Sequence, residues 1–187
     1  MTGLSPTLRK ELLTAIPNLR AFAMSLCGNP TRADDLAQET LMKAWDKIGS
    51  FEPGTNLKAW LFTILRNVYF SELRKRKREV EDADGHLLAG LAVHPAQLGH
   101  MDASDFIIAL QQIPIDQREA LILVGAEGFS YEEVAAISGV AVGTIKSRVN
   151  RARGRLTEIL GLDGVADFGP DRMSQASIAP GAAGRSE

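Results

Sequence analysis

GFSYEEVAAISGVAVGTIKSRVNRARGRL, residues 128–156, carries the clearest structural pattern in this chain. Ser130 and Glu133 have the spacing of a capping box, which predicts a short helix through Ser138. Gly139 can adopt the positive φ angle that ends such a helix, and a second helix follows within a few residues. Two short helices joined by a tight turn that contains glycine form a helix-turn-helix.

The second of these helices has one apolar face and one small, polar and cationic face. With roughly 100° between successive residues, the apolar stripe consists of Val142, Ile145, Val149, Ala152 and Leu156. Glycines and short polar side chains occupy the opposite side, and cations flank them. Such a face fits a DNA major groove, because short side chains reach base edges while the cations contact phosphates. The candidate contacts are Thr144, Lys146, Ser147, Arg148, Asn150, Arg151, Arg153 and Arg155.

A solvated basic helix is the alternative interpretation of this positive charge. The whole chain has a formal net charge of -2, and solvated helix faces usually mix both signs. Charge alone would not explain the cap, the turn and the small outer residues together. We therefore favour DNA binding.

The composition excludes several classes of protein. The 187 residues contain no stretch close to the roughly 18 uninterrupted apolar residues that a membrane-spanning helix needs. The N-terminus lacks the basic and then apolar pattern of a signal peptide. We therefore expect a cytoplasmic protein with no membrane insertion. The single cysteine, Cys27, allows no internal disulfide and no cysteine metal cluster.

Catalysis and metal binding find no support in the sequence. The three histidines, His86, His94 and His100, lie in one stretch without sustained periodicity. Such a stretch fixes neither a metal site nor a catalytic pair. We expect no enzyme activity, no metal and no cofactor.

Periodicity divides the chain into two helical segments and two segments that lack it. Residues 1–78 and 105–161 predict helices throughout. Residues 79–104 contain five Asp or Glu residues and no Lys or Arg, which predicts an acidic, flexible linker. Residues 162–187 are rich in Pro, Gly and small residues, which predicts a disordered tail. The expected fold is all-α, with two small helical domains joined by the linker.

Three helices are expected in the first segment. Pro17 should interrupt the first of them, and Thr31 should cap the second. The second helix should bury an apolar stripe that includes Trp45. The third helix should run from Leu57 to about Glu79.

Aromatic and cationic side chains share one side of this third helix. The outward residues on a helical wheel are Phe62, Arg66, Phe70 and Arg74, with Asn67 near them. Unstacked bases can stack on such rings while Lys and Arg follow the nucleic-acid backbone. This surface therefore indicates binding of single-stranded DNA.

Three stretches of the sequence resemble a known family. They are DDLAQETLMKAW (34–45), NLKAWLFTILRNVYFSELRKRKRE (56–79) and FSYEEVAAISGVAVGTIKSRVNRAR (129–153). These stretches are similar to conserved regions 2 and 4 of the sigma-70 family, and the presence of only these two regions resembles its extracytoplasmic-function group. QREALILVGAEGFSYEEVAAISG (117–139) looks most like the general stress response class of alphaproteobacteria.

The resemblance implies a promoter-specificity subunit of RNA polymerase. Region 2 would bind the clamp of the largest subunit of core RNA polymerase, and region 4 would contact the flap region. The residues implied in the clamp contact are Asp35, Gln38, Glu39 and Met42. Region 4 would bind a GGAAC-like upstream promoter element as duplex DNA. An anti-sigma factor would hold the chain in check.

Region 2 would also melt a GTT-like downstream promoter element and hold its bases. The residues expected here, from the resemblance and the helical wheel together, are Phe51, Trp60, Arg66, Asn67, Phe70, Arg74 and Lys75. Two weak DNA sites tied to one polymerase become one strong site through effective concentration. This expectation fits a chain with two small DNA-binding domains.

Two other functions compete with this hypothesis. A sigma-like decoy that sequesters an anti-sigma factor would resemble the same regions, but it would need no DNA-reading residues and would carry a receiver domain. The residues after 160 leave no room for a receiver, and the cations of 143–155 are retained. An ordinary helix-turn-helix regulator would leave the first segment unexplained.

Overall fold

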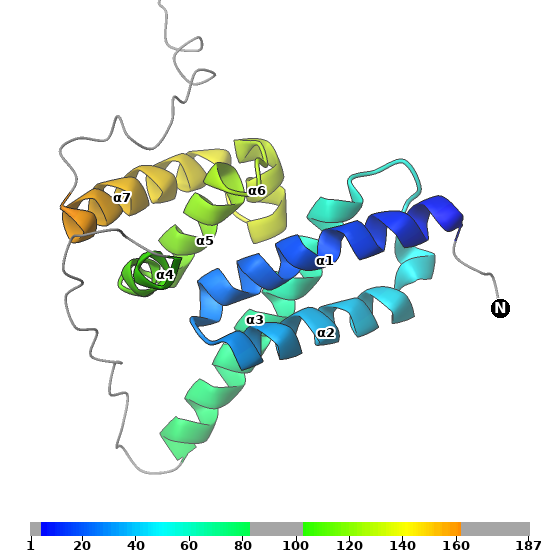
Figure 1. Cartoon of the computed structure of the whole chain (residues 1–187), viewed down its shortest axis with the longest axis horizontal. Coiled ribbons are helices and arrows are strands. Elements are labelled where there is room, and N and C mark those ends of the chain that lie inside the picture. Colours follow the sequence, from blue (N-terminus) through cyan, green and yellow to red (C-terminus); the bar gives the residue numbers. More distant parts are fainter. Residues whose placement is uncertain (1–4, 83–102, 162–187) are drawn as a thin grey trace, which may run out of the picture.

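A computed structural model describes residues 5–82 and 103–161, and every regular element in these two ranges is helical (Figure 1). The helices are α1 (Pro6–Cys27), α2 (Pro30–Asp46), the 3₁₀ turn η1 (Ile48–Ser50), α3 (Leu57–Asp82), α4 (Ala103–Gln111), α5 (Ile115–Gly125), α6 (Tyr131–Ser138) and α7 (Val142–Leu160). The expected all-α fold class is confirmed. Most of the expected linker 79–104 and all of the expected tail 162–187 lie outside the described residues.

Helices α1, α2 and α3 form the N-terminal unit. The prediction that Pro17 interrupts the first helix was wrong, since α1 runs through it as one helix of 22 residues. Pro17 is exposed, so its ring does not disturb the packed side of the helix. Gly28, at φ 67°, ends α1 in the left-handed conformation that favours glycine.

Helix α2 begins earlier than the sequence predicted. Its N-cap is Asn29, whose side-chain oxygen accepts from the backbone N–H of Arg32 at 2.9 Å, and Thr31 lies already inside the helix. Pro30 occupies the first helical turn, where its missing N–H costs nothing. The side of α2 that packs against α1 and α3 consists of Ala33, Leu36, Ala37, Thr40 and Ala44.

Helices α4 to α7 form the C-terminal unit, and the predicted helix-turn-helix is confirmed in α6 and α7. Ser130 and Glu133 make both hydrogen bonds of the capping box, and Gly139 ends α6 at φ 67°. Within α7, four of the five predicted core residues are buried, whereas Val142 is half-buried. Helix α5 packs against α7 and holds it in a fixed position within the C-terminal unit.

The two units pack against each other and share one hydrophobic core. Helix α1 contacts α4 and α5, and α3 contacts α6. At the junction, the Phe62 ring stacks on Phe22 with 5.0 Å between centroids and meets the edge of Phe129 at 5.3 Å. Phe62 is fully buried, so the prediction that it points outward to DNA was wrong. A helical wheel of α3 alone could not show that the C-terminal unit covers this side.

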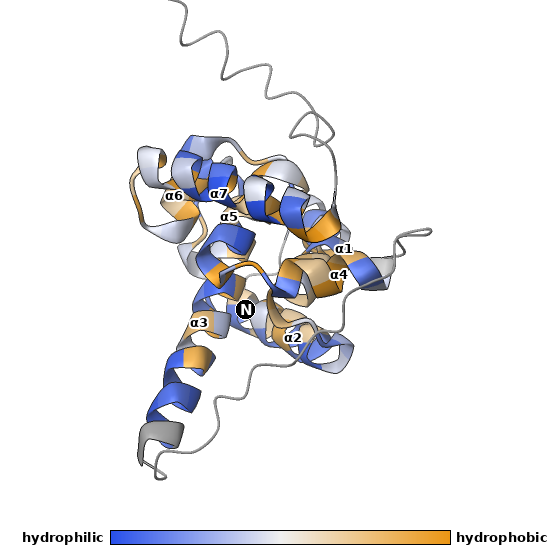
Figure 2. Cartoon of the chain, turned by 90° about the vertical axis from the view of Figure 1, so that its left-hand side faces the viewer, coloured by the Kyte–Doolittle hydropathy of each residue, from blue (hydrophilic) through white to orange (hydrophobic). Residues whose placement is uncertain are grey.

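Beyond the core, the C-terminal half of α3 extends away from the other helices (Figure 2). None of the helices in the described part of the chain is long and apolar enough to cross a membrane.

Candidate nucleic-acid and polymerase interfaces

The outer side of α7 presents a group of exposed polar and cationic side chains. Its exposed members are Lys146, Asn150, Arg151 and Arg155. The Lys146 ammonium group lies 5.8 Å from the centre of the Tyr131 ring, so α6 helps to position it. Because the opposite side of α7 is buried in the C-terminal unit, this exposed group is directed away from the protein.

The other predicted upstream contacts are less accessible in this structure. Arg148 forms an ion pair with Asp116 of α5 at 3.2 Å, and its side chain is only 19% exposed. Arg153 and Thr144 are half-buried, and the Ser147 hydroxyl donates to the Thr144 carbonyl at 2.9 Å. Of the eight residues predicted to contact the upstream element, four are therefore exposed and available to a DNA groove. The other four are at least partly covered by other protein atoms.

This division gives a prediction for Arg151. Replacing it with alanine should weaken binding to the upstream element by about 1–3 kcal/mol if a bidentate base contact is lost. Arg148→Ala should have a smaller effect, because Arg148 is already held by Asp116. Fluorescence anisotropy with matched and scrambled duplexes would measure both. An equal loss for Arg151→Ala on both duplexes would identify a phosphate contact instead.

The α3 residues that were expected to contact the downstream promoter element fall into two groups, one covered by other protein atoms and one exposed. Arg66 belongs to the covered group, since its Nε donates to the Glu119 carboxylate of α5 at 2.5 Å and its guanidinium lies 4.6 Å from the Phe70 ring. Glu119 is 1% exposed, and burial raises its pKa, although the Arg66 charge acts in the opposite direction. The Arg66 guanidinium is therefore already paired with the Glu119 carboxylate in this structure.

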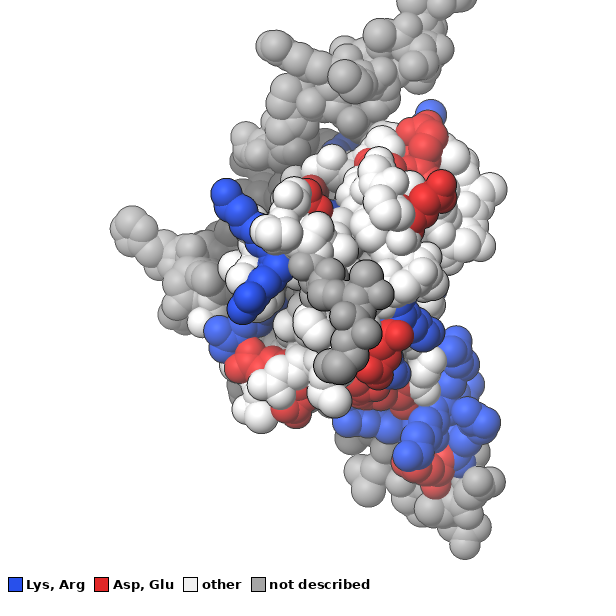
Figure 3. Space-filling model, turned by 90° about the vertical axis from the view of Figure 1, so that its right-hand side faces the viewer, with Lys and Arg blue, Asp and Glu red and all other residues white. Residues whose placement is uncertain are grey.

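Asn67, Arg74 and Lys75 form the open group. Arg74 and Lys75 are exposed near the end of α3, where Figure 3 shows Lys and Arg gathered. Asn67 is also exposed and lines a hollow of about 310 Å³ together with Lys43 and Lys47 of the preceding helix and turn. Sequence reasoning missed these two lysines, of which Lys43 lies in the last turn of α2 and Lys47 is its C-cap residue.

Phe51 and Trp60 form a separate aromatic pair beside the loop after η1. Their ring centroids are 5.3 Å apart, and both side chains are half-buried. Trp60 packs against the core as its helical position suggested. Phe51 itself belongs to the loop 49–56, so the exposed part of this pair lies at that loop.

The expected polymerase contacts lie together on the exposed side of α2. Asp35, Gln38 and Met42 are exposed, and Glu39 is half-buried and pairs with Lys43 at 2.7 Å. Met42 is 69% exposed, which is unusual for a large apolar side chain. This side of α2 is therefore free to meet another protein.

Trp45 also belongs to this surface, although the sequence predicted it in the core. Its side chain is 64% exposed, because the buried side of α2 is narrow and Trp45 lies beyond its half-buried edge at Leu41. Leu13 of α1 is 59% exposed beside it. The two line a shallow, mainly apolar hollow of about 190 Å³ between α1 and α2.

No group of His, Cys, Asp and Glu in residues 5–82 and 103–161 is arranged to hold a metal ion. The three histidines, His86, His94 and His100, lie outside the described residues. Cys27 is half-buried, its thiol donates to the Asn29 carbonyl at 3.3 Å, and burial raises its pKa. The thiol is thus held in its neutral, less reactive form.

Comparisons with known proteins agree on one family. Sigma-70 region 2 matches residues 13–79, and Sigma-70, region 4 matches residues 106–156. The chain is 60% identical over 175 residues to the ECF RNA polymerase sigma factor EcfG of Rhodopseudomonas palustris, covering 94% of this chain and 97% of that one. It is also 34% identical to the ECF RNA polymerase sigma factor SigE of Mycolicibacterium smegmatis, over 74% of this chain and 56% of that one.

Solved structures of other proteins also resemble this chain in three dimensions. The sigma factor RpoE of Bartonella quintana, crystallised with the anti-sigma factor NepR, matches with a TM-score of 0.75 and 58% identity, over 86% of this chain and 100% of that one. The PhyRSL–NepR complex of Sphingomonas sp. Fr1 matches with a TM-score of 0.61 but only 20% identity, over 87% of this chain and 94% of that one. The second likeness shows a shared fold alone.

Proposed function

Because this chain belongs to the extracytoplasmic-function group of the sigma-70 family of RNA polymerase sigma factors, we propose that the surfaces on α2, α3 and α7 divide the work of promoter recognition. Sigma factors of this family are not enzymes, and they direct transcription initiation; this one belongs with the general stress response. The observation that carries the proposal is the exposed set of Lys146, Asn150 and Arg151 on the second helix of a helix-turn-helix. A decoy for an anti-sigma factor would have no use for them.

Helix α7 reads the upstream element as duplex DNA. Asn150 and Arg151 are placed to reach base edges, while Lys146 and Arg155 meet the phosphates on either side. A GGAAC-like sequence is the expected element, and bidentate pairing of Arg151 with guanine would supply discrimination.

The downstream element is held as a single strand by the N-terminal unit. Asn67 contacts a base near the loop 49–56, and Lys47 neutralises the backbone beside it, whereas Lys43 is paired with Glu39. Arg74 and Lys75 extend this positive surface along α3. The expected element is GTT-like.

Core polymerase binds the exposed side of α2 through the clamp of its largest subunit. The acidic and amide groups of Asp35 and Gln38 fit a basic partner, and Met42 and Trp45 supply apolar area. The C-terminal unit meets the flap region. The chain works in the cytoplasm, where polymerase and promoters are found.

Trp45 gives a test of the polymerase surface. Trp45→Ala should weaken binding to core polymerase about tenfold or more, because buried tryptophans are frequent hot spots of interfaces. Ile108→Ala is the matched control, since Ile108 is a large exposed apolar residue on α4, outside this surface. Titration of the labelled chain with core polymerase measures both variants. Equal affinity for the two would remove Trp45 from the interface.

An anti-sigma factor of the NepR type is a further proposed partner. The support is the 58% identity to RpoE of Bartonella quintana, which was crystallised with NepR. Calorimetry with a purified NepR-type protein tests this partner, and an absence of heat at micromolar concentration would contradict it.

Promoter binding distinguishes the sigma factor from the decoy. Core polymerase and the chain together should retard a promoter fragment that carries both elements, at concentrations at which neither of them retards it alone. Scrambling the upstream element should abolish the complex. A decoy would leave the fragment unbound under all these conditions while still binding the NepR-type protein.

A further inference from the structure

One cation of the helix-turn-helix is held by an acid of a neighbouring helix. Arg148 of α7 forms an ion pair with Asp116 of α5, with 3.2 Å between the Arg148 Nε and the Asp116 Oδ2. Asp116 lies in the first turn of α5, and α5 packs along α7. The pair therefore joins the helix that faces DNA in the proposed function to the helix beside it.

Arg148 belongs to a row of three cations on α7. Arg151 and Arg155 follow it by three and seven positions, a spacing that places side chains along the same side of a helix. Both of these arginines are exposed, whereas Arg148 is half-buried against Asp116. A DNA strand that follows this side of α7 would meet a third cation if Arg148 were free.

The acid that holds Arg148 is open to solvent. The Arg148 side chain is 19% exposed, but the Asp116 side chain is 44% exposed. In the pair of Arg66 with Glu119, by contrast, the acid is only 1% exposed. An ion pair with an exposed partner is weak, because water compensates the charge that is released, whereas a buried acid would be left without compensation. Arg148 can therefore exchange its carboxylate for another anion.

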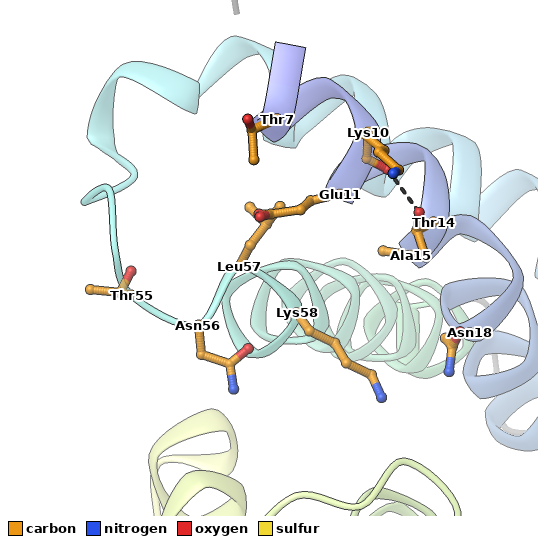
Figure 4. Close-up of a pocket in the computed structure, with 10 residues that line it drawn as sticks. All are labelled: Thr7, Lys10, Glu11, Thr14, Ala15, Asn18, Thr55, Asn56, Leu57 and Lys58. Atoms are coloured by element: carbon orange, nitrogen blue, oxygen red, sulfur yellow. Dashed lines mark hydrogen bonds between the residues drawn. The ribbon is translucent and has the colours of Figure 1, made fainter. Parts of the chain in front are cut away.

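The cation beside the cleft between α1 and the start of α3 is held more firmly. Figure 4 shows Lys58 and Asn18 at this cleft of about 660 Å³, and both contact Glu127 of the C-terminal unit. The Glu127 side chain is only 5% exposed. An anion in the cleft would have to displace this buried carboxylate from Lys58, so the pair of Arg148 with Asp116 is the better candidate for exchange.

A second acid of α5 also acts on Arg148. Burial raises the pKa of Glu119, and the charges of Arg66 and Arg148 lower it. Arg148 is thus attracted by Glu119 as well as by Asp116. Removing the charge of Asp116 would therefore weaken the hold on Arg148 without abolishing it, and the effect on DNA binding should be moderate.

Asp116 also has structural roles that need no DNA. A carboxylate in the first turn of a helix is favourable beside the partial positive charge of the helix N-terminus. The ion pair also braces α5 against α7. If these were the only roles of Asp116, replacing it would leave the affinity for DNA unchanged or lower it. Competition for Arg148 predicts the opposite sign, a gain of affinity.

We propose that Asp116 withholds Arg148 from DNA phosphates and thereby limits the affinity of the helix-turn-helix for DNA of any sequence. A phosphate contact carries no sequence information, so the preference for the upstream element stays with the base contacts of Asn150 and Arg151. The inference rests on the proposed function, because it applies only if α7 binds duplex DNA.

Asp116→Asn tests this competition in the full chain. The substitution removes the charge that holds Arg148 and keeps the size of the side chain. Glu158→Gln is the matched control, because Glu158 is an exposed acid of α7 and its loss changes the net charge equally. The probes are two fluorescein-labelled duplexes, one with the upstream element and one with that element scrambled, each titrated by fluorescence anisotropy.

Asp116→Asn should bind both duplexes about threefold more tightly than Glu158→Gln, the scale of a partly exposed ion pair. The ratio of the two affinities should be the same in both variants, since the added contact does not depend on sequence. Equal affinities of the two variants, or weaker binding by Asp116→Asn, would overturn the proposal.

Salt dependence counts the added phosphate contact directly. Each phosphate that a cation neutralises on duplex DNA steepens the fall of log affinity with log salt by about 0.9. Asp116→Asn should therefore show a slope steeper than that of Glu158→Gln by up to about this amount on the scrambled duplex. A structural role of Asp116 would not change this slope, and equal slopes would contradict a new phosphate contact.

Arg148→Gln shows whether Asp116 acts through Arg148. In this background Asp116→Asn should leave the affinity and the slope unchanged, because no guanidinium remains to be released. The same gain in this background would mean that Asp116 only repels DNA by its own charge, and it would overturn the proposal.

The scrambled duplex also separates failure of this inference from failure of the proposed function. If the chain prefers the upstream element but Asp116→Asn behaves like Glu158→Gln, the inference alone is refuted. If no form of the chain distinguishes the two duplexes, with or without core polymerase, the reading of the upstream element by α7 is refuted, and the inference loses its basis.

Discussion

Phe62→Ala is expected to lower the free energy of unfolding by about 3–5 kcal/mol, the usual cost of deleting a buried aromatic ring. The ring is fully buried and touches Phe22 in its own unit and Phe129 in the other. Alanine would leave a cavity at the point where the two cores join. Urea denaturation followed by circular dichroism measures the effect.

Phe70→Ala is the control for this prediction. Phe70 lies on the same helix but is only half-buried, so its loss should cost clearly less stability. If Phe62 instead pointed outward, as a wheel of α3 suggests, Phe62→Ala would cost under about 1 kcal/mol and would weaken single-strand binding. That pair of results would contradict the packing of the C-terminal unit on α3.

Arg118→Ala is expected to destabilise the contact between the units by about 3 kcal/mol, since hydrogen bonds to charged groups are worth more than neutral ones. Its guanidinium donates to Ser25, Leu26 and Ile113 carbonyls and to both oxygens of Gln111. Alanine would leave these buried acceptors short of donors. Hydrogen exchange of the amides in the last turns of α1 should become faster.

Two further substitutions control for the Arg118 result. Arg9→Ala removes an exposed arginine from α1 and should change stability by less than about 0.5 kcal/mol. Arg118→Lys keeps the charge but cannot reproduce the planar set of donors. Its loss of stability should therefore lie between those of Arg118→Ala and Arg9→Ala. If Arg118→Ala behaved like Arg9→Ala, Arg118 would not hold the units together.

Local patterns were sufficient to predict the helix-turn-helix. The capping box at Ser130 and Glu133, the positive φ of Gly139 and the apolar stripe of α7 each depend on residues within one or two turns. Such short-range interactions are encoded directly in the order of residues. The errors at Pro17 and Thr31 were also local, and they concerned where helices begin and continue rather than whether they form.

Burial depends on neighbours that are distant in sequence, and there the predictions were less successful. Trp45 was expected in the core, but the helices packed around α2 leave it uncovered, whereas Phe62 was expected outside and a second unit covers it. A wheel shows which side of a helix is apolar, and it does not show which partner meets that side. The pairing of Arg66 with Glu119, 53 positions apart, was invisible for the same reason.

The candidate DNA-binding residues show the same difference between what local patterns predict and what depends on long-range packing. Lys146, Asn150 and Arg151 were predicted from one helix and are exposed together, whereas Lys43 and Lys47 join Asn67 only through the packing of α2 on α3. The acidic stretch between the units was predicted from composition, and most of it lies outside the described residues.

Run-off transcription is the decisive experiment for this sigma factor. Purified core polymerase and the chain would be combined on a template with GGAAC-like and GTT-like elements at promoter spacing, and on templates with either element scrambled. We predict a transcript that requires the chain and both elements. No transcript from the intact template, with the chain still binding a NepR-type protein, would contradict the sigma function and favour the decoy.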